Sequence, residues 1–543
     1  MNRPMMRDVV TAPERRADYE RRRLWDDRTL AGRVAAHAAS QPAAVAVVDD
    51  EGRRRRTYRE LAADAVAMAR LVRDAGVEPG DVVSVQLPNW YETVVVAVAV
   101  QSVGAVINPL LPNYRRRELA HVFTTARPRL VFTPTEYRGF DHPTLIAEVA
   151  AETGVTPHHV VLGPGAPPLG DLLGGDAPEG AALTAAAPAD AVSELIFTSG
   201  TESTPKAIMH TEQTTNFSVR VARRDLGVGV ADVVWMPSPV GHSTGFNYGL
   251  RFALYHGLPL VLQDRWDPAV AVDLVAAERA SYTLAATTFL QDLVEESARR
   301  GARLESLRCF GCGGAPVPPA LVAAADAQGI RVLRLYGSTE VLVATWNRPD
   351  APLTQRMDTD GTPMSDVQVE IRDDDGRVCG PGETGEIFVR GPNTCVGFFA
   401  DPERTAATFD AEGWVRSGDL AVAGEENALT VAGRKKEIII RGGINIAPRE
   451  IEELILAWPE VERAAVVGVP DERLGERGCA CVVLRPGATL TFDDMVGRLR
   501  ATGLATYKLP EQLAILDSLP TTASGKVQKF EIVRLLAGAA KER

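Results

Sequence analysis

The sequence predicts an α/β fold, in which a large N-terminal domain of layered α/β subdomains and a β-rich subdomain precedes a small α+β C-terminal domain. Through most of the chain, short runs of apolar β-branched residues alternate with Ala-, Leu- and Arg-rich stretches, a pattern typical of buried strands covered by helices. From about Gly361, short strands and Gly/Pro/Asp turns dominate. A second alternation of strand-like and helix-like segments follows the charged cluster at 433–437. We therefore expect domains over residues 1–433 and 434–543.

Individual elements follow from the periodicity of the apolar residues. Strands are expected to begin near Ala44, Val82, Arg129, Pro259 and Arg331. Long helices are expected over 58–75 and 268–279. The apolar run at 94–100 is too short to span a bilayer and predicts a buried helix that leads into a strand. In the C-terminal domain, we expect helices over 449–457, 492–501 and 529–536, and strands over 464–470, 479–486 and 512–517.

Composition excludes several classes of protein. The formal net charge of -12 over 543 residues argues against nucleic-acid binding, although a local pocket can still hold phosphate. The arginine-rich N-terminus lacks the apolar core of a signal peptide, so we expect a cytoplasmic protein without a membrane span. Six cysteines are few for this length, which fits a reducing compartment. Cys309 and Cys312 have C-x-x-C spacing, but no second pair matches it, which favours a structural role over a metal site.

The most informative stretch is TSGTESTPK at 198–206, which follows the apolar strand SELIF at 193–197. Small hydroxylated residues and a glycine after a strand leave backbone N–H groups free to bind phosphate, and a lysine adds a cation. The stretch is not a Walker loop, because no second glycine precedes Lys206. Taken alone, it fits a solvated turn equally well.

Other motifs give this loop a context. It resembles the phosphate loop of the adenylate-forming superfamily, which includes acyl-CoA synthetases, firefly-type luciferases and peptide-synthetase adenylation domains. Further signatures of that family follow in the right order: MPSPVGH at 236–242, GCGGAP at 311–316, LYGSTE at 335–340, GWVRSGDL at 413–420, GRKKE at 433–437 and SGK at 524–526. Because their order agrees over about residues 30–536, the chain is identified as a member of this superfamily.

The resemblance implies that the chain binds ATP and Mg²⁺ and forms an acyl-adenylate with release of pyrophosphate. Such a site needs cations and fixed donors, because negative charge builds on the phosphoryl oxygens. The implied nucleotide-binding residues are Thr198, Ser199, Gly200, Thr201, Lys206, Gly313, Gly314, Ala315, Tyr336, Gly337, Thr339, Asp419, Arg434 and Lys526. Among these, Asp419 would hold the ribose, and Lys526 would place a mobile charge on the α-phosphate. Glu340 and Thr201 would hold Mg²⁺, and the implied catalytic residues are Lys526, Thr201, Glu340 and His242.

The same resemblance implies the sites of the acid and of its acceptor. The acid pocket would be lined by His242, Phe246, Gly311, Gly313 and Tyr336. His242 is expected to position the acid rather than move a proton, because a carboxylate nucleophile needs no base. Coenzyme A would pass Arg441, Gly442 and Gly443, where glycines allow close backbone approach. Lys436 would be the hinge about which the mobile C-terminal domain turns between the two steps.

Less common strings indicate a branch of the superfamily. They are PNW at 88, INPL at 107, YRGFDH at 137, GHSTGFNYG at 241, LQDRWD at 262 and PDERLG at 470. Together they look like cyclohexanecarboxylate-type and medium-chain acid CoA ligases. We therefore expect ATP-dependent activation of a small carboxylic acid, followed by thioester formation with CoA.

The chain also departs from the family pattern. The usual phosphate loop reads TSGTTGxPKG, whereas this chain has Glu202 in place of the second Thr, Ser203 in place of the next Gly and Ala207 in place of the last Gly. An added carboxylate and a lost glycine are expected to stiffen the loop and weaken ATP binding. Two alternatives stay open: an adenylating enzyme that passes the acid to a free-standing carrier protein or an amine, and one that activates an unusual small acid such as nitrite. A binding protein without turnover is disfavoured by the retained Glu340, Asp419 and Lys526.

Overall fold

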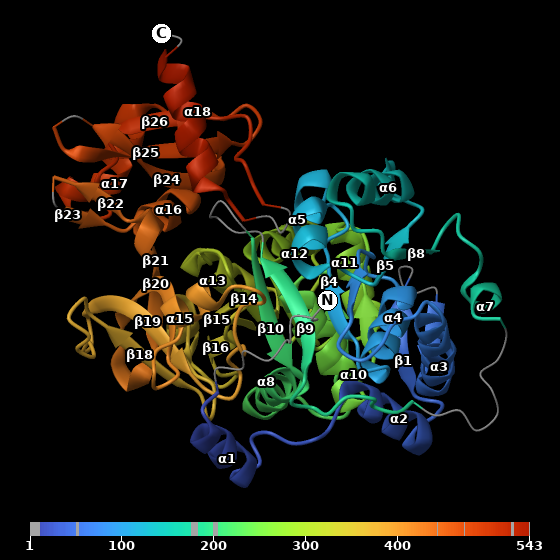
Figure 1. Ribbon diagram of the computed structural model, residues 1–543. Helices are drawn as coiled ribbons and strands as arrows, with labels where there is room; N and C mark the ends of the chain where they lie inside the picture. Colours follow the sequence, from blue (N-terminus) through green and yellow to red (C-terminus); the bar gives the residue numbers. More distant parts are fainter. Residues whose placement is uncertain are drawn as a thin grey trace.

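The computed structural model describes residues 11–49, 54–174, 183–198, 205–442, 444–471, 473–522 and 526–541. The expected α/β fold is confirmed (Figure 1): two large sheets and their helices form the N-terminal part, a smaller antiparallel sheet lies beside them, and a separate α+β unit ends the chain. Within these ranges, every helix is too short or too polar to cross a lipid bilayer.

The first large sheet has six strands and leads into the phosphate segment. Its spatial order is β10 (Lys206–Thr211), β9 (Val192–Thr198), β4 (Val106–Pro109), β3 (Val82–Val85), β5 (Leu130–Pro134) and β8 (His158–Leu162). The pairs are parallel except for β9 and β10, which are antiparallel. Parallel sheets of this kind need cover on both faces, and the helices of this region include α3 (Tyr58–Asp74), α4 (Tyr91–Ser102), α5 (Arg116–Ala126) and α6 (His142–Thr153).

Helix α4 has no exposed residue: all of its residues from Tyr91 to Ser102 are buried. It lies against α2 (Leu30–Ser40), α3 and β4. Its middle, residues 94–100, is apolar on every side, as expected for a helix in the interior of a large protein. The buried helix predicted from this run is therefore observed, with β4 after it. Helix α3 begins at a capping box, in which Thr57 and Glu60 each accept a backbone N–H of the other residue.

The second large sheet has nine strands and carries three of the six later motifs at its strand ends. Its order is β17 (Thr362–Pro363), β16 (Leu342–Trp346), β15 (Val332–Ser338), β14 (Cys309–Gly313), β13 (Tyr282–Ala285), β11 (Val234–Met236), β12 (Leu260–Leu262), β1 (Val45–Asp49) and β2 (Arg54–Thr57). In this spatial order, the six strands from β15 to β1 pair in parallel with one another. Strand β2 at one edge, and β16 and β17 at the other, pair antiparallel. Its connecting helices include α8 (Glu212–Asp225), α11 (Pro268–Ala277), α12 (Thr287–Arg300) and α13 (Pro319–Ala327).

The sequence pattern of short strands and turns that begins near Gly361 corresponds to an antiparallel sheet. Its order is β18 (Gln368–Arg372), β19 (Thr384–Arg390), β20 (Val415–Ala423) and β21 (Leu429–Arg434). Strand β21 ends at Arg434, where η3 (Lys435–Glu437) leads into the last unit. The domain boundary between residues 433 and 434 stays a prediction. The end of the antiparallel sheet lies at the same place along the chain.

The C-terminal unit has its own sheet and core. Strands β23 (Ile444–Ile446), β22 (Ile439–Arg441), β25 (Gly475–Leu484) and β24 (Val461–Asp471) lie in that order, and β26 (Gln512–Ile515) pairs with β25. Helices α16 (Pro448–Leu456), α17 (Phe492–Ala501) and α18 (Lys529–Lys541) accompany them. All the helices and strands predicted for this segment are present, within a few residues of the expected bounds.

Candidate active site

The phosphate segment joins two paired strands. Ser199, Gly200 and Thr201 lie outside the described residues, as do Glu202 and Ser203. The ends of the segment are described: Thr198 closes β9, Lys206 opens β10, and the two residues pair across the strands. The Lys206 Nζ atom lies 3.6 Å from Glu340 Oε1. The cation expected at the phosphates and the carboxylate expected at the metal are thus neighbours.

The segment that carries Thr339 and Glu340 is the corner between β15 and β16. Tyr336 and Gly337 belong to the end of β15, and the corner is held by backbone contacts. The Glu340 carbonyl accepts a hydrogen bond from the Cys395 N–H at 2.7 Å. The imidazole of His210, on β10, bonds through Nε2 to the Thr339 carbonyl at 2.7 Å. These contacts fix the direction in which the Glu340 side chain leaves the backbone.

His210 is a residue that sequence reasoning missed. It is fully buried, its Nδ1 lies 3.1 Å from the Thr214 hydroxyl, and burial lowers its pKa to about 4. The signal was present in the sequence, because a histidine stands inside the apolar strand AIMHT that follows the phosphate loop. A buried histidine must find hydrogen-bond partners, and those partners join β10 to the Glu340 corner.

Acid will therefore destabilise the protein through His210. Its pKa is about 4 in the folded state against an ordinary value of 6.5, so the unfolded chain binds the extra proton and stability falls as the pH drops from 6.5 towards 4. Urea unfolding at several pH values between 7 and 4.5 measures this slope, which is the change in the free energy of unfolding per pH unit. In His210→Gln, the slope should be smaller by up to about 1.4 kcal/mol per pH unit. The exposed His158→Gln is the control, and equal slopes in both variants would contradict the assignment.

The expected ribose ligand Asp419 is held by two other predicted nucleotide residues. Its Oδ2 accepts a hydrogen bond from the Tyr336 hydroxyl at 2.9 Å, and its Oδ1 lies 3.2 Å from Arg434 Nε. Burial raises the pKa of Asp419, while the positive charge of Arg434 and the Tyr336 hydroxyl act in the opposite direction. Tyr336 of β15 and Arg434 of β21 therefore both contact the carboxylate of Asp419 on β20.

Lys526 reaches this region from the C-terminal unit. A methyl group on Gly314, which follows β14, would lie 3.9 Å from Lys526 Nζ. Surrounding protein atoms lower the pKa of Lys526, and the charge of Arg434 adds to this effect, while Asp419 opposes it. The Lys526 N–H donates to the Thr522 hydroxyl at 3.1 Å. The adenine-side loop that contains Gly313, Gly314 and Ala315 is thus the neighbour of the predicted catalytic lysine.

His242 lies on a loop that is packed too closely for larger residues. A methyl group on Gly241 would lie 2.2 Å from the Leu110 carbonyl oxygen. The His242 Nδ1 accepts a hydrogen bond from the Thr244 N–H at 3.3 Å. Burial lowers the pKa of His242 to about 4, with a further contribution from the charge of Lys526. The imidazole is therefore neutral near pH 7 and available as a hydrogen-bond partner.

Comparison with known proteins identifies the family. The AMP-binding enzyme family matches residues 34–399, and the AMP-binding enzyme C-terminal domain matches residues 450–526. The chain belongs to the AMP-binding enzyme family. This AMP-binding enzyme is 37% identical over 521 residues to a medium-chain fatty-acid–CoA ligase of Escherichia coli (strain K12), covering 95% of this chain and 92% of the relative.

Other relatives of the AMP-binding enzyme agree with this assignment. A salicylyl-CoA synthase / salicylate adenylyltransferase of a Streptomyces species is 32% identical over 98% of both chains. The ATP-bound structure of MatB from Rhodopseudomonas palustris superposes with a TM-score of 0.84 at 28% identity, covering 94% of this chain and 99% of that one. The AMP-binding enzyme is therefore an ATP-binding, acid-activating ligase.

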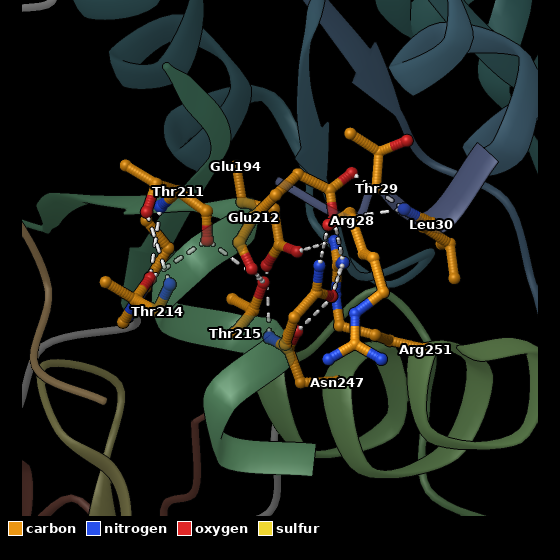
Figure 2. Close-up of polar contacts among 12 residues, drawn as sticks. Arg28, Thr29, Leu30, Glu194, Thr211, Glu212, Thr214, Thr215, Asn247 and Arg251 are labelled. Atoms are coloured by element: carbon orange, nitrogen blue, oxygen red, sulfur yellow. Dashed lines mark hydrogen bonds and ion pairs between the residues drawn. The ribbon is translucent and has the colours of Figure 1, made fainter. Parts of the chain in front are cut away.

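The predicted acid-pocket residue Phe246 begins a π-helix of the AMP-binding enzyme, η1 (Phe246–Arg251). Such helices are rare and occur often at functional sites. The far end of η1 is anchored by Arg251, which is fully buried (Figure 2). The Arg251 guanidinium pairs with Glu194 of β9 and lies 2.5 Å from Glu212 at the start of α8. This network joins the helix beside the acid site to the strand that leads into the phosphate loop.

The same network is extended by amides. Arg251 also donates to Asn247 Oδ1 at 3.1 Å and to Asn216 Oδ1 at 2.8 Å. The Asn247 amide donates to Glu194 at 3.1 Å, and Glu212 accepts the Leu30 N–H. Two buried carboxylates share one guanidinium, so their remaining lone pairs must be satisfied by such donors. No periodic pattern in the sequence predicts this network.

The residues predicted for CoA lie apart from these contacts. Arg441, in β22, pairs with Glu511 at 2.5 Å, and the Gly442 N–H donates to the Leu474 carbonyl at 2.7 Å. Gly443 lies outside the described residues. The predicted hinge residue Lys436 lies in η3, between the antiparallel sheet and the last unit of the AMP-binding enzyme.

Proposed function

We propose that the chain activates a small carboxylic acid at the place where Lys526, Asp419, Glu340 and His242 converge, and that Mg²⁺ and CoA are its cofactor and acceptor. The observation that supports this proposal is that Lys526, which lies beside Gly314, interacts electrostatically with Arg434, Asp419, Glu340 and His242, and these come from four other motifs. Positive charge from Lys206, Arg434 and Lys526 would offset charge that builds on the α-phosphate. Asp419 would accept hydrogen bonds from the ribose.

The donor set fits Mg²⁺ held mainly by the nucleotide. Among the described residues, no cluster of three or more His, Cys, Asp or Glu side chains offers a complete metal site. Magnesium prefers hard oxygen ligands and commonly takes one or two carboxylates together with substrate phosphates, and Glu340 supplies such a carboxylate. When bound, the ion would neutralise charge on the phosphates, while Thr201 would add a hydroxyl ligand.

The space in front of Gly311 supports a small acid. A methyl group on Gly311 would lie 2.8 Å from Cζ2 of Trp346 and 3.2 Å from carbon atoms of Leu284 and Leu335. Trp346 is buried, and its ring packs at 6.0 Å from that of Tyr248 on η1. The indole and the two leucines therefore fill the space beside Gly311, and in this proposal they would limit the length of the acid.

A panel of acids tests this proposal. Pyrophosphate release from ATP should be measured with hexanoate, cyclohexanecarboxylate, benzoate, salicylate and palmitate, each with and without CoA, and with nitrite plus an arylamine. We expect release with a short or cyclic acid and a CoA thioester as the product, but not with palmitate. Adenylate that accumulates without transfer to CoA would favour a carrier protein or an amine as acceptor. Acid-independent ATP use, or none with any acid, would contradict the proposal.

Loss of the Asp419 carboxylate will raise the ATP requirement. In Asp419→Asn, one charged acceptor is replaced by a neutral one, and a hydrogen bond to a charged group contributes about 1.5–3 kcal/mol. The KM for ATP should therefore rise by about ten- to a hundredfold, which steady-state pyrophosphate release measures. The KM for the acid serves as the internal control. An unchanged KM for ATP would count against ribose binding.

A further inference from the structure

One buried ion pair joins the C-terminal unit to the large α/β part. Arg449 lies near the start of α16, with 12% of its side chain exposed, and its Nη2 lies 3.6 Å from Oδ2 of Asp360. Asp360 precedes β17 of the nine-stranded sheet and is itself buried. Its Oδ1 accepts from Arg334 Nε at 3.0 Å and its Oδ2 from the Val431 N–H at 2.9 Å. The carboxylate is thus fixed by the large part of the chain, independently of Arg449.

A second pair between the same two parts is exposed. Arg485 of the C-terminal unit lies 3.0 Å from Glu295 of α12, with 39% and 53% of the two side chains exposed. Exposed pairs of this kind contribute little to a conformational equilibrium, because water and salt screen them. Arg449 and Asp360 are screened much less, so the two pairs offer a matched comparison.

Helix α16 connects Arg449 to the segment that carries Lys526. Glu452, one turn after Arg449, lies 2.7 Å from Lys529 Nζ. Lys529 opens α18 and also lies 3.3 Å from Glu437 of η3. Because Lys529 follows Lys526 by three residues, the place of α16 against Asp360 determines where Lys526 lies relative to Gly314.

We propose that Arg449 is a positioning residue for adenylation: its ion pair with Asp360 anchors α16, and through Lys529 this holds Lys526 at the nucleotide site. The proposal rests on the proposed function, in which Lys526 acts on the α-phosphate. An interaction made in only one arrangement of two units raises the population of that arrangement. Loss of the pair therefore lowers the fraction of molecules that are competent for the first step, without removing any group that touches the nucleotide.

The test separates the two half-reactions. The probe acid is hexanoate or cyclohexanecarboxylate, whichever the wild type activates. Adenylation is measured as single-turnover pyrophosphate release, and the second step as thioester formation from the synthetic acyl-adenylate and CoA. In Arg449→Met, adenylation should slow by about tenfold, while the second step keeps its rate. Arg449→Lys should recover part of the loss, and the exposed control Arg485→Met should stay within about twofold of the wild type.

Each outcome decides the proposal. An equal fall in both half-reactions of Arg449→Met would indicate general damage to the fold and would overturn the positioning role. Unchanged adenylation would also overturn it, and so would an equal loss in Arg485→Met. If Arg449→Met does not fold, Arg449→Lys and Lys529→Met must slow adenylation and leave the rate of the second step unchanged. Failure of the wild type to release pyrophosphate with any acid would instead contradict the proposed function.

Discussion

Lys526→Ala will lower the rate of adenylate formation by about a hundred- to a thousandfold while the fold stays intact. Removal of one preorganised donor from a site of developing charge typically costs this much. Lys526 is exposed as a whole residue, although protein atoms surround its ammonium group, so its loss should not change the unfolding transition. Single-turnover pyrophosphate release measures the effect.

The matched control for this variant is Lys508→Ala. Lys508 lies on the same C-terminal unit and makes a surface ion pair with Glu450 at 2.6 Å, so its removal should change adenylation by less than about twofold. Near-wild-type adenylation in Lys526→Ala would defeat the assignment. A comparable loss in Lys508→Ala would show that general disturbance of the unit, not loss of a charge at the α-phosphate, causes the effect.

Arg251→Met will be among the most destabilising single substitutions in the chain. The methionine leaves two buried carboxylates, Glu194 and Glu212, without their shared cation (Figure 2). Breaking a buried ion pair by removal of one partner costs about 3–5 kcal/mol. Equilibrium unfolding in urea should show this loss, and Arg377→Met, which breaks exposed pairs, should leave the unfolding transition nearly unchanged.

A rescue experiment shows whether charge causes the effect. Glu194→Gln added to Arg251→Met removes one of the uncompensated charges and should recover part of the lost free energy of unfolding. A triple variant that also carries Glu212→Gln should recover more. If neither addition changes the stability of Arg251→Met, loss of packing around η1 rather than unpaired charge would explain the defect.

Elements with long apolar periods could be predicted from the sequence. The buried helix α4, the long helix α3 and the six elements predicted for the C-terminal unit agree with the predicted ranges within a few residues, because local pattern and burial coincide there. Strands β22 and β23 of that unit were not predicted. The fold class and the family were also predicted correctly. Both rest on motifs whose order along the chain is independent of tertiary contacts.

Contacts between distant residues could not be predicted in the same way. Arg251, Glu194 and Glu212 are separated along the chain, and each one alone looks like an ordinary surface charge in the sequence. Arg449 and Asp360 give no local signal either, since their meeting depends on how two units pack. For the phosphate loop, Thr201 stays a prediction, because it lies outside the described residues.

The complete burial of α4 has a consequence for directed evolution of this enzyme. Because residues 94–100 are apolar and buried on every side, substitutions there must preserve both volume and apolarity to avoid strain or voids. Libraries that seek new substrates should therefore leave this segment constant. Diversity is better placed at Trp346, which lies against Gly311 in the proposed acid pocket.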